Sequence, residues 1–184
     1  MIKYSLRAIL LALCCLSAVA SADIGETWLL VDTRQKIISV MEGDRVVDAF
    51  GNIAMGASGA GIKQRQGDSK TPLGSFRVTE VRPSQRFRTF VGLDYPNQEY
   101  ARQALEEGRI SDRDYLAIVQ ALEEGRSPPA DTPLGGLIGI HGVGGGSLWV
   151  HANFNWTEGC IALDNSQIDR LSQWVREGTR VEIR

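Results

Sequence analysis

Residues 141–160 read HGVGGGSLWVHANFNWTEGC and contain both histidines of the protein, His141 and His151, together with Cys160. The stretch is rich in glycine, which suits turns and close approaches of the backbone. A thiolate is a strong nucleophile, and histidine is its usual proton acceptor. The stretch therefore favours a catalytic cysteine–histidine pair in which Cys160 attacks and one of the two histidines acts as base.

The N-terminal residues 1–22 have the pattern of a secretory signal peptide. Lys3 and Arg7 precede an apolar run of about 15 residues that ends in the small residues Ala-Ser-Ala. The run is shorter than the roughly 20 apolar residues that a transmembrane helix needs, and a retained membrane anchor is the alternative interpretation. We expect removal of the segment, export to the periplasm, and no stable membrane span in the mature protein.

Removal of residues 1–22 leaves 184 − 22 = 162 residues, which suits a single domain over 23–184. Cys14 and Cys15 leave with the signal peptide, so Cys160 is the only cysteine of the mature sequence. An unpaired thiol in an oxidising compartment indicates a reactive cysteine. Two basic residues leave as well, so the formal net charge changes from −2 to 18 − 22 = −4. This mild acidity gives no support for nucleic-acid binding.

Alternation of apolar and polar residues predicts an antiparallel meander of three strands at 27–32, 36–41 and 45–50. The segment 56–74 is too rich in glycine and polar residues for regular structure and is predicted to be a long loop. The remaining predicted elements are a strand at 75–81, a buried strand at 135–140 that ends at His141, a helix at 166–177, and an edge or barrel strand at 180–184.

Residues 93–136 form an insertion with helical character, in which 98–126 consist of good helix formers that end twice in glycine. Ser111 and Asp114 resemble a capping box. Because the insertion leads directly to the strand that carries His141, we expect it to lie beside the site as a candidate lid. The alternative is a hairpin that only completes the core. The whole order predicts an α+β, mainly β fold, with a mixed sheet or small barrel and an inserted helical hairpin.

The same residue types also occur in sites with other functions. Cys160 could be an inert core residue, and a histidine at a strand end could merely donate to a backbone carbonyl. His141, His151 and Cys160 could be three metal ligands, but their spacing fits no familiar zinc pattern and no fourth ligand is evident. The run GVGGGS lacks the Lys-Ser/Thr of a phosphate-binding loop, and no helix is expected after it. Gly159 leaves room for a substrate carbonyl beside the thiol, so acyl transfer is the favoured chemistry.

Two motifs resemble the L,D-transpeptidase catalytic domain family, which is also called YkuD-like. The first is GDSKTPLGSFRV at 67–78, and the second combines the His-Gly pair at 141–142 with TEGCIALDN at 157–165. Together with the first strands and the last helix and strand, the resemblance covers most of residues 27–184. It implies a mainly β domain that acts on the cell wall.

The resemblance also implies a chemistry. Cys160 is the expected nucleophile, His141 its base, and Thr157 and Gly159 are expected to hold the site. The thiol attacks the bond between the L-centre of meso-diaminopimelate and the following D-residue of a peptidoglycan stem peptide, forming a thioester. An amine acceptor, on a second stem peptide or a lipoprotein, or water then resolves the thioester. No metal or organic cofactor is implied.

The residues expected to line the substrate site are Gly142, His151, Trp156, Glu158 and Asn165. Glu158 stands where many members of the family have a second histidine, and Ala162 stands where many have arginine. The choice of acceptor therefore stays open. Transpeptidation is favoured over hydrolysis of stem peptides or of a wall-attached lipoprotein by a carboxypeptidase or amidase. A non-catalytic wall-binding protein is the third alternative, and the intact Cys160 and His141 argue against it.

Overall fold

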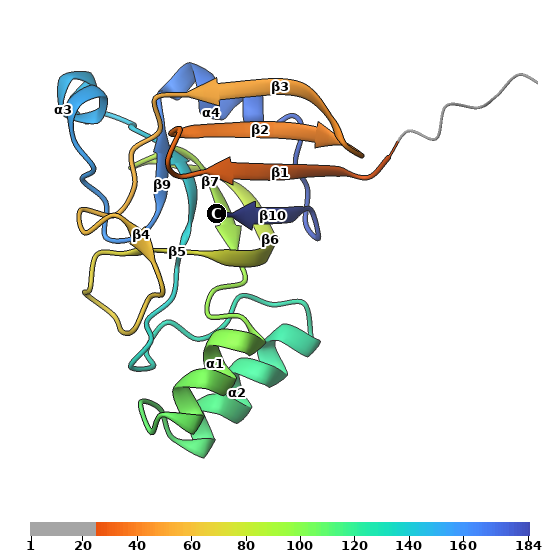
Figure 1. Ribbon diagram of the computed structural model, residues 1–184, viewed down its shortest axis with the longest axis vertical. Helices are drawn as coiled ribbons and strands as arrows, with labels where there is room; N and C mark the ends of the chain where they lie inside the picture. Colours follow the sequence, from red (N-terminus) through yellow and green to blue (C-terminus); the bar gives the residue numbers. More distant parts are fainter. Residues whose placement is uncertain (1–24) are drawn as a thin grey trace, which may run out of the picture.

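The computed structural model describes residues 25–184 as a large mixed β-sheet with a helical hairpin that projects from one end (Figure 1). Eight strands lie in the order β3-β2-β1-β10-β6-β7-β8-β9, and the short strands β4 and β5 form a separate pair. The strands are β1 Thr27–Asp32, β2 Ile37–Glu42, β3 Arg45–Gly51, β4 Ala60–Gly61, β5 Thr71–Pro72, β6 Gly74–Ser84, β7 Arg88–Leu93, β8 Gly139–Gly142, β9 Ile161–Leu163 and β10 Arg180–Ile183. The helices are α1 Gln98–Glu106, α2 Asp112–Glu123, α3 Leu148–Asn153 and α4 Asn165–Leu171. This confirms the predicted mainly β, α+β fold.

The first three strands form the predicted antiparallel meander, in which β1 pairs with β2 and β2 with β3. Leu29, Val31, Ile38 and Val40 alternate with more exposed residues and are fully buried, as the period of a half-buried strand requires. The prediction for the last strand was wrong where it allowed an edge position. β10 pairs in parallel with β1 and antiparallel with β6, so it lies inside the sheet.

The sheet curls so that its two ends approach each other. Ala54 lies just after β3, at one end of the sheet, and Ala162 lies in β9, the strand at the other end. The two residues exchange two backbone hydrogen bonds of 3.0 and 2.8 Å. The curled sheet encloses the main core, which includes Phe50, Phe76 and Ile140. The sheet therefore approaches a small barrel, and it brings residues 53–57 against the stretch that precedes β9.

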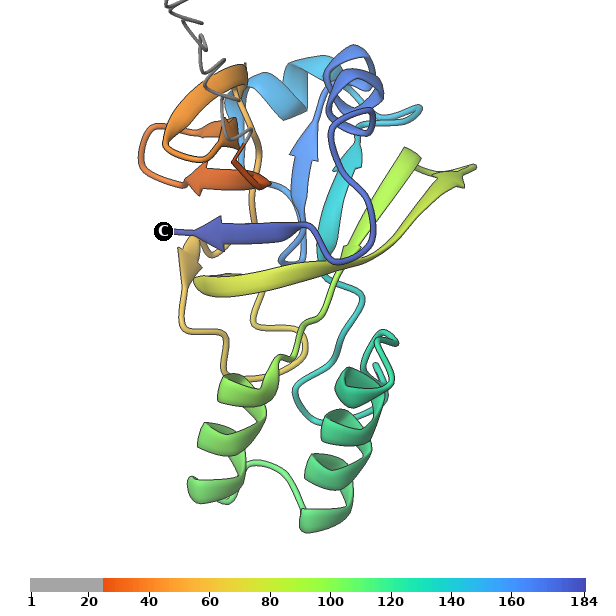
Figure 2. The same ribbon diagram turned by 90° about the vertical axis from the view of Figure 1, so that its right-hand side faces the viewer.

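The insertion forms two packed helices below the sheet (Figure 2). The predicted capping box of α2 is present between Ser111 and Asp114, and Gly108 and Gly125 end the helices with positive φ angles. The hairpin has its own small core, whose buried members are Ala101, Ala104, Ile110, Ile118 and Leu134. Tyr100 instead packs in the main core, so α1 is attached to the sheet by its first turn.

Two local predictions differ from the structure in their bounds. The strand expected at 135–140 begins only at Gly139 and includes His141, because Gly135 and Leu137 have positive φ angles that an extended strand cannot accommodate. The helix expected at 166–177 is α4, which begins after the N-cap Asp164 and ends at Leu171. After Leu171 the backbone continues in tight turns, in which the N–H groups of Gln173 and Trp174 bond to the carbonyls of Arg170 and Leu171, three residues earlier.

One helix and several strands were not predicted. The short strands β4 and β5 lie inside the segment 56–74, which was expected to have no regular structure. A six-residue helix, α3, follows the glycine run, with Ser147 as its N-cap, so the expectation of no helix there was wrong. β7 and the second half of β6 lie in an arginine-rich segment that contains Pro83 and lacks clear alternation. The predicted signal peptide, residues 1–22, lies outside the described residues. Within residues 25–184, none of the helices has the length and apolar character to cross a membrane.

Candidate active site

The sheet places Cys160 and His141 on one face of two adjacent strands. β8 and β9 run in parallel, with Ile140 opposite Ile161 and His141 opposite Ala162. Cys160 immediately precedes β9 and lies two positions before Ala162. Since side chains two apart on a strand point to the same face, Cys160 and His141 are diagonal neighbours across the pair. This juxtaposition brings together the two residues that the sequence nominated as nucleophile and base.

The Cys160 thiol rests in its protonated form. Its Sγ atom donates a 3.4 Å hydrogen bond to the backbone carbonyl of Leu137, in the segment that leads from the hairpin to β8. Burial raises the pKa of this thiol to about 11, while a hydrogen bond from the Gly139 backbone and the charge of Lys63 act in the opposite direction. At neutral pH the thiol therefore needs a base before it can attack a carbonyl.

His141 is suited to be that base. It is buried, and its ring lies 4.0 Å, centroid to centroid, from that of Phe87 and 5.9 Å from that of Trp156 in a T-shaped contact. Burial lowers the pKa of His141, so the ring is neutral at neutral pH. Its Nδ1 lies 2.8 Å from the Gly142 carbonyl oxygen, which can only accept, so Nδ1 carries the proton. Nε2 is then left as the proton acceptor.

Thr157 fixes the loop that leads to the cysteine. Its hydroxyl donates to the Cys160 carbonyl at 2.6 Å and accepts from the Gly159 N–H at 3.2 Å. The backbone of Thr157 is itself hydrogen-bonded to Met55 and Ala57. The loop is thus tied to the segment that closes the sheet, and the N–H of Gly159 is engaged inside the loop.

Gly159 is required by both its conformation and its surroundings. Its φ angle is +139°, a region that residues with a side chain rarely adopt. A Cβ atom at this position would lie 2.7 Å from the Lys70 carbonyl oxygen and 2.9 Å from the Ile138 side chain. The absence of a side chain therefore lets the loop 56–74 pack directly against the residue before the nucleophile.

The five residues expected to line the substrate site lie at different depths around Cys160. Glu158 is exposed, and Trp156 is half-buried and makes a T-shaped ring contact with His141. His151 is buried in α3, and neither of its ring nitrogens has a hydrogen-bond partner among the described residues. Gly142 and Asn165 pack against each other, since a Cβ at Gly142 would lie 2.8 Å from Oδ1 of Asn165. The Asn165 side chain both donates to and accepts from the Gly144 backbone at 2.8 Å, which holds the glycine run in place.

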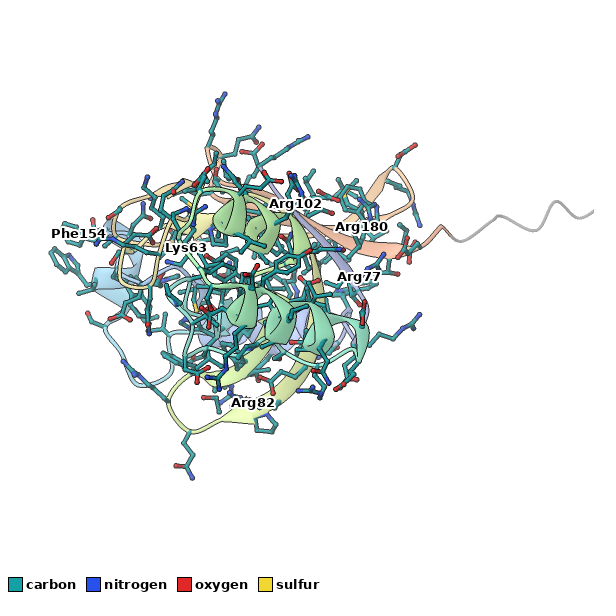
Figure 3. All side chains as sticks on the ribbon, turned by 90° about the horizontal axis from the view of Figure 1, so that it is seen from below. Lys63, Arg77, Arg82, Arg102, Phe154 and Arg180 are labelled. Carbon is teal, nitrogen blue, oxygen red and sulfur yellow. The ribbon has the colours of Figure 1, made fainter. Side chains whose placement is uncertain are left out.

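Sequence reasoning missed an ion pair beside the nucleophile loop. Lys63 has only 3% of its side chain exposed, and its Nζ lies 2.5 Å from Oδ1 of Asp68 and 3.5 Å from the Glu158 carbonyl oxygen. Figure 3 shows Lys63 on the same side of the molecule as Phe154, which follows α3. A lysine in a polar loop is ordinarily exposed, so nothing in the sequence pattern marked this one. The feature that could have indicated the ion pair is the partner of Lys63, Asp68, which belongs to the motif at 67–78.

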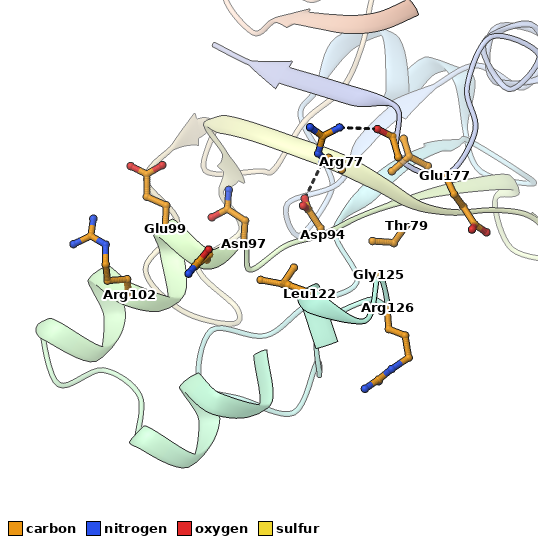
Figure 4. Close-up of a pocket in the computed structure, with 13 residues that line it drawn as sticks. Arg77, Thr79, Asp94, Asn97, Glu99, Arg102, Leu122, Gly125, Arg126 and Glu177 are labelled. Atoms are coloured by element: carbon orange, nitrogen blue, oxygen red, sulfur yellow. Dashed lines mark hydrogen bonds between the residues drawn. The ribbon is translucent and has the colours of Figure 1, made fainter. Parts of the chain in front are cut away.

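A separate cavity of about 740 Å³ lies between β6, α1 and the end of α2 (Figure 4). Its wall includes Arg77, whose backbone N–H donates to Asp94 and whose guanidinium donates to the Gly178 carbonyl. None of the candidate catalytic residues lines this cavity. Within residues 25–184, no group of three or more His, Cys, Asp or Glu side chains is arranged to hold a metal ion.

Solved structures with the same fold match most of this chain. The helical cell shape determining protein Pgp2 from Campylobacter jejuni is 21% identical, with a TM-score of 0.55, and the match covers 88% of this chain and 50% of that one. Bd1075 from Bdellovibrio bacteriovorus is 18% identical, with a TM-score of 0.54, over 88% of this chain and 48% of that one. An L,D-transpeptidase mutant from Enterococcus faecium is 14% identical, with a TM-score of 0.50, over 88% and 50%. The chain thus spans about half the length of these proteins, and the likeness shows the fold.

A comparison with curated proteins finds no match. The family comparison is more specific than the likeness in fold. The family model of the L,D-transpeptidase catalytic domain, YkuD, matches residues 26–183, which is nearly all of the described chain. The match includes both sequence motifs and the strand pair that joins Cys160 to His141. The chain therefore belongs to the L,D-transpeptidase catalytic domain family.

Proposed function

We propose that this protein is an exported L,D-transpeptidase that modifies peptidoglycan through a thioester on Cys160. The observation that supports the proposal is the register of β8 and β9, in which His141 lies opposite Ala162, two residues after Cys160, in a chain of this family. A buried neutral imidazole and a partly buried neutral thiol form an acid–base pair that a single proton transfer can activate.

The proposed reaction has two half-reactions. Rotation of the Cys160 side chain away from the Leu137 carbonyl lets Nε2 of His141 take the thiol proton. The sulfur attacks the carbonyl carbon at the L-centre of diaminopimelate, and the carbon–nitrogen bond to the following D-residue breaks. His141 returns its proton to the departing amine, and a thioester remains. An acceptor amine then attacks the thioester, His141 takes a proton from that amine, and the new amide forms as the thiol is regained.

Hydrolysis is the competing outcome, since water can resolve the same thioester. Glu158, which is exposed one residue before Gly159, stands where the family pattern has a histidine, so it bears on which acceptor enters. The decisive experiment incubates the mature protein with tetrapeptide-containing muropeptides and measures product masses. A cross-linked or exchanged stem supports the transpeptidase, and a shortened stem or a released lipoprotein supports the hydrolase. Unchanged muropeptides would support the third alternative, a non-catalytic wall-binding protein.

The pH dependence of acylation reports the state of His141. Because burial lowers its pKa below the ordinary value of 6.5, His141 stays neutral at pH 6.5 and gains a proton only as the pH falls further. We expect the acid limb of kcat/KM for thioester formation to lie below pH 6.5. The same shift makes the unfolded chain bind this proton first, so folding stability also falls with pH below 6.5. An acid limb at or above pH 6.5 would contradict the burial of the base.

The helical hairpin is proposed to restrict the acceptor. Arg109 donates to the Gln64 carbonyl at 2.8 Å, and the Gln66 N–H donates to Pro133 at 2.9 Å, so the hairpin is attached to the loop beside Cys160. Replacing 102–126 with a Gly/Ser linker keeps Tyr100 in the core. We expect thioester formation to persist and the ratio of hydrolysis to transfer to rise severalfold, because closing elements commonly exclude water.

The matched variant for this test is Arg109→Ala, which keeps the hairpin and removes its hydrogen bond to Gln64. It should shift the product ratio in the same direction by a smaller factor. Mass spectrometry of both products, with melting curves for both variants, provides the measurement. An unchanged ratio in the two folded variants would make the hairpin purely structural.

A further inference from the structure

We propose that Lys63 is a positioning residue for the nucleophile, whose buried ammonium stabilises the Cys160 thiolate and holds the Glu158–Gly159 peptide. The proposal rests on the proposed function only in taking Cys160 as the reactive group. Three features of the structure carry it: the burial of a charge that is costly to bury, its place against the nucleophile loop, and the carboxylate that keeps it there.

The burial of Lys63 calls for a reason. Its side chain is 3% exposed, and that of its partner Asp68 is 11% exposed. Lysine is almost never fully buried unless it is paired, and removing two charges from water is unfavourable for each ion. A buried ion pair is often no more stable than apolar residues of similar volume. Fold stability alone is therefore a weak reason for this pair.

The ammonium faces the loop that carries the nucleophile. Nζ of Lys63 lies 3.5 Å from the Glu158 carbonyl oxygen and 3.5 Å from where a Cβ of Gly159 would be. Gly159 has no side chain to separate the charge from the peptide that precedes Cys160. A positive charge at this place favours the thiolate over the thiol, and it opposes the effect of burial on the Cys160 pKa.

Asp68 keeps the ammonium in position. Its carboxylate accepts from the Lys63 ammonium at 2.5 Å and from the backbone N–H groups of Gln64 at 2.8 Å and Lys70 at 3.0 Å. Burial acts to raise the pKa of Asp68, but these hydrogen bonds outweigh burial and lower it. Asp68 therefore stays ionised, and its backbone contacts remain when Lys63 is replaced. The loop should therefore keep its conformation when the charge of Lys63 is removed.

The test compares neutral and charged substitutions of Lys63. Lys63→Gln removes the charge and retains an N–H donor toward Asp68, whereas Lys63→Met removes both. Lys63→Arg keeps the charge. Lys36→Met is the matched control, since it removes one lysine charge from the exposed turn between β1 and β2. The readout is the pH dependence of Cys160 alkylation by iodoacetamide, followed by intact-protein mass, together with kcat and KM on muropeptides.

We expect both neutral variants to raise the apparent pKa of alkylation by about one pH unit or more, which slows alkylation at pH 7 roughly tenfold. The acylation kcat should fall with little change in KM. Lys63→Arg should restore much of the rate, and Lys36→Met should match the wild type.

Three results would overturn the proposal. They are an unchanged pH profile in a folded Lys63→Met protein, a Lys63→Gln profile like that of the wild type beside a shifted Lys63→Met profile, and an equal shift in Lys36→Met. The second result would mean that the hydrogen bond, and not the charge, matters. Alkylation needs no stem peptide, so it reads the effect of Lys63 even if the wild-type protein fails to turn over muropeptides. Normal turnover with unshifted alkylation would sink this proposal alone.

Discussion

Cys160→Ala should form no thioester with a stem peptide and should lose at least roughly four orders of magnitude in turnover. Removal of a group that forms the covalent intermediate leaves only the binding and positioning effects of the site, and comparable deletions in serine hydrolases cost up to about 10⁶ in kcat. The fold should persist, because Cys160 is only partly buried and its thiol makes only weak hydrogen bonds, to the Leu137 carbonyl and from the Gly139 backbone. The measurements are product masses, intact-protein mass for the acyl adduct, and a melting curve.

His141→Gln should lose nearly as much, because the thiol has a pKa of about 11 and is almost entirely protonated at neutral pH without a base. Glutamine can still donate to the Gly142 carbonyl but cannot take a proton. Raising the pH should recover part of the lost rate, since hydroxide can then remove the thiol proton that the imidazole removes at pH 7. Effects of the two substitutions should not add in the double variant, because the pair acts as one unit.

His151→Gln is the matched control for the base. His151 is buried like His141 and lies in the same stretch, but it belongs to α3 and is not on the strand pair that carries the nucleophile. We expect a modest loss, within roughly tenfold, as for a residue in the wall of the pocket. A loss as complete as that of His141→Gln would identify His151 as the base. Normal turnover by Cys160→Ala would end the thioester mechanism itself.

The parts of the fold that could be predicted are those with a local signal. The meander follows from alternation around Leu29 and Ile38, and α2 follows from Ser111 and Asp114 at its start and Gly125 at its end. Each of these features depends on residues close in sequence. Hydrophobic periodicity and caps therefore define these elements before any tertiary contact is known.

The predictions that were wrong depend on tertiary contacts or on unusual backbone angles. β8 begins late because Leu137, a residue with a side chain, adopts a φ angle of +55°. α4 ends early, and the indole N–H of Trp174 donates to the carboxylate of Asp48, the fourth residue of β3. The pairing of β10 with β1 and β6 joins strands that are far apart in the sequence. Local patterns contain no information about such contacts.

The site shows the same division. Cys160, His141 and Thr157 could be nominated because residue type and motif agree, and the strand register then brought two of them to one face. Lys63 could not, because its burial depends on how the loop 56–74 folds against Gly159. Gly159 was nominated for the space it leaves to the substrate, and the structure adds a second reason, namely the space it leaves to Lys70 and Lys63.

Gly159→Ala should be the most damaging substitution outside the catalytic pair. The new methyl group would lie 2.7 Å from the Lys70 carbonyl oxygen and 2.9 Å from the Ile138 side chain, and the φ angle of +139° is strained for alanine in any surroundings. The loop must move to accommodate it, and movement there displaces the neighbouring Cys160. We expect about 2–4 kcal/mol of destabilisation from strain and overpacking together. A displacement of the thiol by about 1 Å should lower kcat by roughly 10² or more.

Gly145→Ala separates this effect from a general sensitivity of the glycine-rich stretch. A Cβ at position 145 meets no atom within 4 Å, so alanine there should leave turnover and melting temperature close to the wild type. Alkylation of Cys160 distinguishes displacement of the thiol from unfolding of the protein. A folded Gly159→Ala protein with a displaced thiol still reacts with a small alkylating agent, whereas its rate of thioester formation falls sharply. If Gly159→Ala folds and acylates at the wild-type rate, the loop tolerates a shift of several tenths of an ångström. The tight packing of Gly159 against Lys63 and Lys70 would then not be what aims the nucleophile.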